Sequence, residues 1–158
     1  MNRDPLVLRT GDPVARALDL LIDNRLLALP IVDGEHRYRG MFLKSKLISL
    51  LLPLGAMVGE SIHHISQVPG IGFLTLSTDD LRNAFAAVAQ RPVEDFADPS
   101  TPVFRPDSPL SSALLQLYRT RNFLPVVEEG TDRLLGVIST WDILGTLRAA
   151  RETSETTA

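Results

Sequence analysis

The polar residues best placed to do chemistry lie in one short segment, from Gly136 to Asp142. Gly136 has no side chain, so a ligand or a neighbouring backbone can approach it closely. Ser139 ends an expected strand and Asp142 follows about one helical turn later, so both side chains can face one cleft. A carboxylate there can accept hydrogen bonds from the two vicinal hydroxyls of a ribose, as in dinucleotide-binding folds. Thr140 opens the following helix, where free N–H groups suit a phosphate.

The same segment also has a purely structural interpretation. Ser139 can cap the helix, and Asp142 then stands in the first turn, where an acidic residue is favoured in any protein. The residues alone leave both interpretations open. The observation that favours a ligand is that the pattern occurs twice in the chain.

The two copies of the pattern lie about 96 positions apart, residues 8–52 against residues 104–148, with one gap before each Leu-Pro pair. The matched positions include Arg9 with Arg105, Pro13 with Pro109, Arg25 with Arg121, Leu29-Pro30 with Leu124-Pro125, and Gly40 with Gly136. One copy is too small to bury its own apolar face. We therefore expect the copies to pack on each other and to enclose a cleft with pseudo-twofold symmetry.

The first copy departs from the second at the positions that matter for chemistry. Leu43 stands where the hydroxyl of Ser139 should be, and Lys46 stands where the carboxylate should be. A ribose cannot be held there in the same way. Either this half-site is vacant and Lys46 is a solvated surface residue, or Lys44 or Lys46 supplies positive charge to phosphates.

Each copy predicts the element order β-α-β-β-α. The first helix begins at a proline that follows a capping residue, Asp12 in one copy and Ser108 in the other, and apolar residues then recur at helical spacing. A Leu-Pro pair opens a β-branched strand, a hairpin follows, and the returning strand leads into a second helix, over about residues 44–52 and 140–148. The expected fold class is α+β, with two β-α-β-β-α repeats packed with pseudo-twofold symmetry around a central cleft.

The expected division of the chain has four parts. Repeat 1 covers residues 1–52, a linker covers 53–91, repeat 2 covers 92–149, and a frayed tail covers 150–158. Glycines and prolines interrupt the first part of the linker, so residues 53–77 are expected to form a mobile loop. Thr78 and Asp79 then cap a helix that runs to about Gln90.

Composition excludes several classes of function. The net charge of −3 and the scattered arginines argue against nucleic acid, and with no cysteine there is no thiolate metal site. His63-His64 has no third ligand at metal spacing. No serine, histidine and acid stand in a catalytic order, so the chain is not expected to be an enzyme. No apolar run reaches the roughly 20 residues that span a bilayer, and no signal segment is recognised, so we expect a cytoplasmic protein.

The segment from Gly136 to Asp142, preceded by Leu124-Pro125-Val126-Val127 and by Pro109 at the head of an Ala-Leu helix, resembles the CBS domain. Two tandem copies resemble a CBS pair, also called a Bateman module. The resemblance covers residues 5–149 except the loop at 53–77. It implies a regulatory module that binds AMP, ADP, ATP or S-adenosylmethionine between its repeats, and that commonly assembles as a flat dimer.

The resemblance also implies which residues form the site. The opening strand of one repeat lies against the glycine motif of the other. The better site would then combine Val137, Thr140, Ser139 and Asp142 with an apolar platform for the base and with a group near the phosphates. Leu6 and Leu26 would form the platform and Asn122 would lie near the phosphates; residues such as Leu6 and Leu26 are more often plain core residues.

Two hypotheses follow for the function. The first is a stand-alone sensor of an adenosine-containing nucleotide that requires no cofactor and transmits its occupancy to a regulated protein or to its own dimer. The alternative is a ligand-free dimerisation or protein-interaction module whose nucleotide site has decayed, which Leu43 and Lys46 favour. A homodimer is expected in either case, because the apolar residues from Leu47 to Leu52 cannot all point into one small lobe.

Overall fold

The computed structural model describes residues 1–52, 77–120 and 123–156. The loop expected over residues 53–77 lies outside the described residues except for Ser77, and so does Asn122. The elements, in chain order, are β1 (Leu8–Arg9), α1 (Val14–Asp23), β2 (Ala28–Val32), β3 (Tyr38–Leu43), α2 (Lys44–Leu51), α3 (Thr78–Val88), the 3-10 helix η4 (Val93–Phe96), α4 (Leu110–Thr120), β4 (Leu124–Val127), β5 (Leu134–Ile138) and α5 (Thr140–Thr156).

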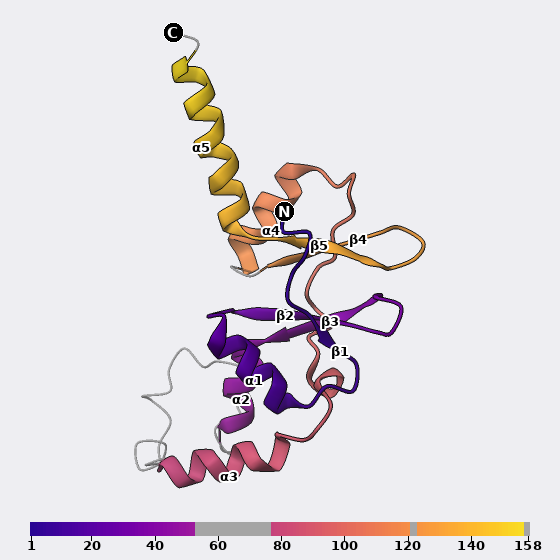
Figure 1. Ribbon diagram of the computed structural model, residues 1–158, viewed down its shortest axis with the longest axis vertical. Helices are drawn as coiled ribbons and strands as arrows, with labels where there is room; N and C mark the ends of the chain where they lie inside the picture. The colour runs from indigo at the N-terminus through magenta and orange to yellow at the C-terminus, as the bar shows by residue number, and fades with distance from the viewer. Residues whose placement is uncertain (53–76, 121–122, 157–158) are drawn as a thin grey trace.

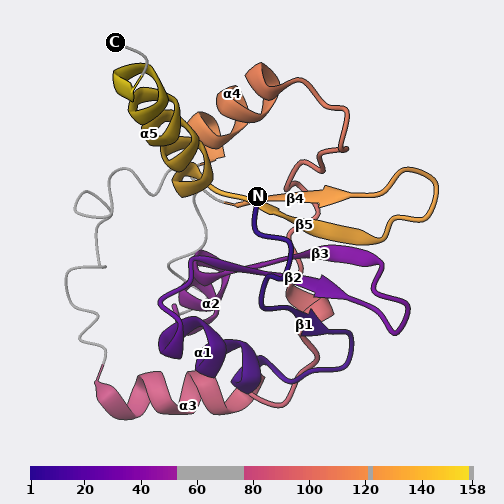
Figure 2. The same ribbon diagram turned by 45° about the horizontal axis from the view of Figure 1, so that its top comes forward.

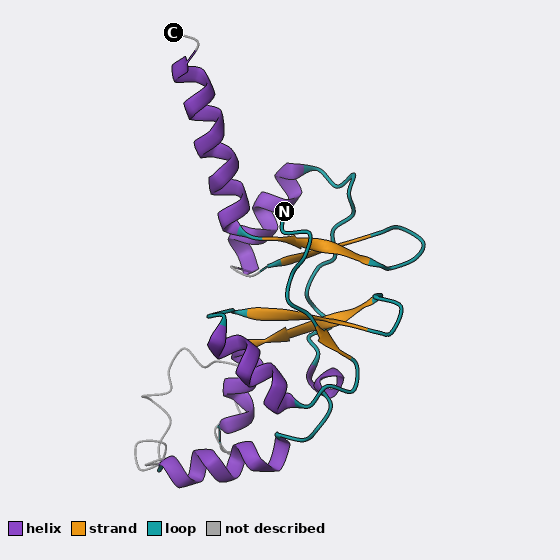
Figure 3. Cartoon of the chain, viewed as in Figure 1, coloured by secondary structure: helices purple, strands orange, loops and turns teal. Residues whose placement is uncertain are grey.

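Each repeat forms its own small sheet with helices on one side. In the first, β1 is parallel to β2, which is antiparallel to β3. In the second, β4 and β5 are antiparallel, and the expected opening strand is reduced to a parallel bridge between Phe104 and Val126. Figures 1 and 3 show the two sheets side by side, with α1, α2 and α3 on the far side of one and α4 and α5 on the far side of the other. The α+β class with two packed repeats is confirmed.

The two hairpins join the repeats along one edge. The backbone N–H of Tyr38 donates to the carbonyl of Asp132 at 2.9 Å, and that of Leu134 donates to the carbonyl of His36 at 3.0 Å. A small cluster of Val32, Val127 and Leu134 is buried between the sheets. Figure 2 shows the hairpins β2–β3 and β4–β5 projecting in the same direction. The pseudo-twofold axis therefore passes between two equivalent hairpins.

The opening segment of each repeat crosses to the other repeat. Asn2 pairs with Val137 through two backbone hydrogen bonds of 2.9 Å. Asp98 forms an antiparallel bridge with Met41 of the first repeat, and its backbone N–H donates to the Met41 carbonyl at 2.8 Å. A Cβ on Gly136 would collide with the backbone oxygen of Asn2, and the glycine has φ +156°. The expected close approach of a neighbouring backbone at this glycine is therefore confirmed.

Three local expectations differ from the structure. Pro13 itself is the N-cap of α1, because the carboxylate of Asp12 turns back to accept from the backbone N–H of Arg9 at 2.8 Å. Ser77, and not Thr78, caps α3, in a reciprocal pair with Asp80. The expected frayed tail is helical as far as Thr156, since α5 continues through a stretch with strong helix formers and an Arg148–Glu152 pair at 3.7 Å.

Candidate functional site

A cavity of about 300 Å³ lies between the repeats, where the opening segment of the chain meets β5. It is lined by Asn2, Asp4, Pro5, Leu6, Asn24, Leu26, Ala28, Pro30, Phe123 and Val137. The structure thus brings together three residues expected from the sequence, namely Leu6, Leu26 and Val137. Leu6 is 46% exposed, so it is not a core residue, whereas Leu26 packs partly against the core of the first repeat.

Ser139 and Asp142 form the head of α5. The hydroxyl and the backbone N–H of Ser139 both donate to Oδ2 of Asp142 at 2.8 Å, and the backbone N–H of Asp142 donates to the Ser139 hydroxyl at 3.4 Å. The other carboxylate oxygen, Oδ1, lies 2.8 Å from the ammonium of Met1. These reciprocal bonds are those of a helix cap. Ser139 and Asp142 therefore make the contacts that the purely structural interpretation of this segment expects.

The Asp142 carboxylate is held in its charged form. Burial raises the pKa of this group, but hydrogen bonds from the Met1 ammonium and from Ser139 lower it by more, so the pKa lies below its ordinary value. Ser139 is 9% exposed, which places its hydroxyl inside the protein. The carboxylate can therefore accept hydrogen bonds at neutral pH, and Oδ1 is the oxygen that is not committed to the cap.

The predicted site residues do not all line one cavity. Ser139 and Asp142 are not among the residues that line the cavity between the repeats; Ser139 follows Val137 by two residues, and Asp142 contacts Met1, the residue before Asn2. Thr140 lines a different cavity, which is formed with α4. Asn122 lies outside the described residues.

Three polar residues of the cavity were missed by the sequence analysis. Asn2, Asp4 and Asn24 contribute amide and carboxylate groups at the entrance of the opening segment and at the end of α1. The side chain of Asn2 accepts from the backbone N–H of Asp4 at 3.0 Å, and that of Asn24 donates to the carbonyl of Leu20 at 3.0 Å. The internal repeat could have indicated Asn2, because a polar residue, Asp98, occupies the equivalent position of the second copy.

The first copy places a lysine where the second has its carboxylate. Lys46 is exposed and lines a cavity of about 420 Å³ with Asp98. The Asp98 carboxylate accepts from the hydroxyl of Ser100 at 2.7 Å and from that of Thr101 at 2.8 Å. Burial raises its pKa, but these bonds and the charge of Lys46 give a net lowering. At the position where the second repeat has Asp142, the first has Lys46, so the two half-sites carry opposite charges there.

The described residues contain no group of three or more histidine, cysteine or acidic side chains that could hold a metal ion. His63-His64 lies outside these residues. Within residues 1–52, 77–120 and 123–156, no helix is both long enough and apolar enough to cross a membrane.

Comparison with known proteins gives one consistent result. The family model of the CBS domain matches residues 1–53 and 93–149. The Arabidopsis thaliana chloroplastic CBS domain-containing protein CBSX2 is 24% identical over 153 residues, which cover 96% of this chain and 62% of that protein. The chain thus spans about three fifths of the length of this relative.

Solved structures share the fold across nearly the whole chain. CbpB of Listeria monocytogenes matches with a TM-score of 0.64 and 16% identity, over 92% of each chain. A complex of CbpB with c-di-AMP has a TM-score of 0.66 and 16% identity, over 98% of this chain and 84% of that one. CBSX2 in complex with AMP has a TM-score of 0.60 and 21% identity, over 94% and 88%.

Proposed function

Because this chain belongs to the CBS-domain family and contains two copies of the domain, we propose that it is a regulatory module that binds an adenosine-containing nucleotide in the cavity between the copies. The observation that carries the proposal is the cavity at the junction of the opening segment with β5. It is lined by both repeats, and its volume of about 300 Å³ is at the lower end for a small-molecule site. A ligand there contacts both repeats at once and can report on their arrangement.

The cavity and the head of α5 together supply apolar and polar groups that suit a nucleoside. Leu6 and Leu26 offer aliphatic faces to a flat base, and the backbone of Val137 continues the same wall. Asp142 would accept from the ribose hydroxyls through Oδ1, exchanging its contact with the Met1 ammonium, while Ser139 keeps Oδ2 in place. Charge-assisted hydrogen bonds of this kind are about twice as strong as neutral ones.

The relatives narrow the class of ligand. CBSX2 is known in complex with AMP, and CbpB in complex with c-di-AMP. Both ligands contain adenine, ribose and phosphate. We therefore propose a mononucleotide or dinucleotide of adenosine, and the proposed role includes no catalytic step and no resident cofactor.

A thermal-shift series with AMP, ADP, ATP, c-di-AMP and S-adenosylmethionine tests this proposal. A ligand at about 100 times its dissociation constant stabilises the folded state by about 2.7 kcal/mol. Leu6→Glu places a carboxylate inside the cavity and should abolish the shift. Leu27→Glu is the matched control, because Leu27 is similarly exposed, at 43%, and lines a different cavity. No shift with any of these ligands at millimolar concentration would contradict the proposal.

A second candidate, a ligand-free dimerisation module, is favoured by the apolar surface of α4 and α5. Exposed fractions reach 60% for Leu110, 81% for Tyr118 and 79% for Trp141. The exposed apolar surface of α2 is smaller than the sequence predicted, because Leu47 is buried and only Ile48 of this helix is largely exposed. A homodimer through α4 and α5 would cover this surface with or without a nucleotide in the cavity.

A further inference from the structure

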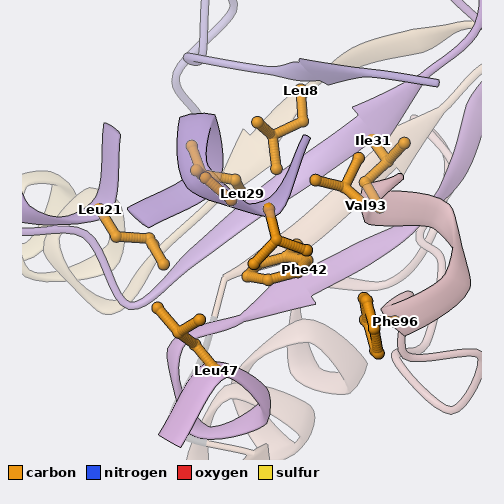
Figure 4. Close-up of a cluster of buried hydrophobic side chains, with 10 residues drawn as sticks. Leu8, Leu21, Leu29, Ile31, Phe42, Leu47, Val93 and Phe96 are labelled. Atoms are coloured by element: carbon orange, nitrogen blue, oxygen red, sulfur yellow. The ribbon is translucent and has the colours of Figure 1, made fainter. Parts of the chain in front are cut away.

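The first repeat carries a second cavity, which the proposed nucleotide site does not use. This cavity, here called the repeat-1 cavity, has a volume of about 420 Å³ and lies between the head of α2 and the segment that follows η4. Among the described residues that line it, Lys46 and Asp98 are charged, and Leu43 and Phe96 are large and apolar. Figure 4 shows Phe96 grouped with Phe42 in the core of the first repeat, so packing fixes this part of the lining. The volume is within the usual range for a small-molecule site.

The backbone and the side chain of Asp98 are both held in place. The backbone N–H of Asp98 donates to the carbonyl of Met41 at 2.8 Å. The hydroxyl and the backbone N–H of Ser100 donate to Oδ1 of Asp98 at 2.7 and 2.9 Å, and the Thr101 hydroxyl donates to Oδ2 at 2.8 Å. Each carboxylate oxygen has two lone pairs. Among the described residues, only Thr101 donates to Oδ2, so this oxygen can accept a further hydrogen bond from a ligand.

Lys46 supplies a positive charge that Asp98 does not neutralise by contact. Lys46 is exposed, and within residues 1–52, 77–120 and 123–156 it forms no ion pair. Burial raises the pKa of Asp98, but the bonds from Ser100 and Thr101 and the charge of Lys46 lower it by more, so the carboxylate is charged at neutral pH. The repeat-1 cavity therefore presents one cation and one anion, and both can bind a ligand.

The head of α2 favours a negatively charged group beside Lys46. At the head of α5, the hydroxyl and the backbone N–H of Ser139 both donate to the carboxylate of Asp142. Leu43 and Lys46 stand at the equivalent positions of α2 and cannot form such a cap. Leu43 makes no side-chain hydrogen bond as the N-cap, and no acidic residue stands in the first turn of α2. No side chain of α2 therefore offsets the positive end of the helix dipole, which adds to the charge of Lys46.

We propose that the repeat-1 cavity binds a free amino acid in its zwitterionic form. The carboxylate of the ligand lies against the Lys46 ammonium and the head of α2, and the ammonium of the ligand donates to Oδ2 of Asp98. The side chain of the ligand lies against Leu43 and Phe96. A simple anion is repelled by Asp98 and a simple cation is repelled by Lys46, whereas a zwitterion satisfies both charges at once. This site is separate from the cavity between the repeats and does not depend on nucleotide binding.

A screen of the standard L-amino acids by thermal shift at millimolar concentration tests the proposal, and calorimetric titration then measures the affinity of those that stabilise the chain. At least one amino acid is expected to bind saturably. Two derivatives of that amino acid remove one charge each, since the N-acetyl derivative lacks the ammonium and the carboxamide lacks the carboxylate. Each derivative should bind at least about tenfold more weakly, because it loses a hydrogen bond between charged groups.

Two variants of the cavity should each weaken binding at least about tenfold, namely Lys46→Met and Asp98→Asn. Lys44→Met is the matched control, because Lys44 is exposed on the same helix and lines a different cavity. It should leave binding unchanged. Leu6→Glu, in the cavity between the repeats, should abolish the nucleotide shift and keep the amino-acid shift. Either proposal can therefore fail without the other.

Four outcomes would contradict the zwitterion site. Absence of saturable binding by any amino acid overturns it, and so does equal affinity of Lys46→Met and wild type. Binding of both derivatives as tightly as the parent amino acid overturns it as well. If inorganic phosphate binds and no amino acid does, the cavity is an anion site instead. Circular dichroism identifies variants that fail to fold; Lys46 is exposed, so Lys46→Met decides the outcome if Asp98→Asn does not fold.

Discussion

Replacing Gly136 by alanine tests whether the crossing of the opening segment holds the two repeats together. A Cβ at this position collides with the backbone oxygen of Asn2 and lies 3.2 Å from the Cα of Arg3. Because both contacts are with backbone, no side chain can move to relieve them. The opening segment must leave β5, which costs the two Asn2–Val137 hydrogen bonds, at about 0.5–1.5 kcal/mol each. The positive φ adds about 1–2 kcal/mol of strain.

The expected loss for Gly136→Ala is therefore about 2–5 kcal/mol in the free energy of unfolding, or roughly 5–15 °C in Tm. Urea denaturation measures it. Gly130→Ala is the control for backbone strain alone, because Gly130 has φ +81° with open space around it, and it should lose only about 1–2 kcal/mol. Gly145→Ala, in a helix with open space, should gain about 0.5–1 kcal/mol. A loss at Gly136 no larger than that at Gly130 would refute the reasoning.

Four other predictions concern the ligand, the core of the first repeat, the pH dependence of stability and the dimer. Asp142→Ala should abolish most adenosine-ligand affinity in calorimetric titration while Lys46→Ala changes it less, and equal affinity of Asp142→Ala and wild type would mean that the ribose assignment is wrong. Phe96→Ala should lower the free energy of unfolding by about 3–5 kcal/mol, because the ring is 7% exposed in the first core; a loss below about 1 kcal/mol in urea denaturation would show that η4 does not support that core. The pKa values of Asp98 and Asp142 are lowered in the folded state, so their contributions to stability are present above the ordinary aspartate pKa of about 3.9 and are lost as pH falls through the folded values. Asp142→Asn should therefore reduce the loss of stability at acid pH, measured as the free energy of unfolding against pH. An unchanged loss would contradict the lowered pKa of Asp142. The chain should sediment as a homodimer that Trp141→Glu weakens, and a single 17.4 kDa species of wild type at micromolar concentration would exclude the dimer.

The repeat made much of this fold predictable. Two copies in register predicted the helices and the hairpins, because each of these features depends on local pattern, and the resemblance to the CBS domain implied the crossing of the opening segments. The resemblance to the CBS domain was confirmed over residues 1–53 and 93–149. Leu6, Leu26 and Val137, which the resemblance implied as site residues, line one cavity.

Other features depend on contacts that a local pattern does not encode. The 3-10 turn at Val93–Phe96 follows Pro92 and has only two apolar residues, so its sequence resembles the linker that precedes it. The turn is stabilised by burial of Val93 and Phe96 in the core of the first repeat. The residues of that core, such as Val14 and Ala17, lie about eighty positions earlier in the sequence. Asp12 was predicted as a helix cap from its position before a proline, but the amide of Arg9 competes for the same carboxylate and binds it.

The exchange of segments between the copies links the core of the first repeat to the cavity between the repeats. Residues that lead into the second copy complete the first core through Val93, and the same stretch then pairs with Met41 through Asp98. Asn2 makes the equivalent pair with Val137, and Asn2 and Asp4 line the cavity between the repeats. If Asp142 binds the nucleotide as proposed, it exchanges its contact with Met1, so nucleotide binding changes the contacts of the segment that crosses between the repeats. By linkage, the free energy by which the nucleotide weakens the Met1–Asp142 contact must equal the free energy by which that contact weakens nucleotide binding.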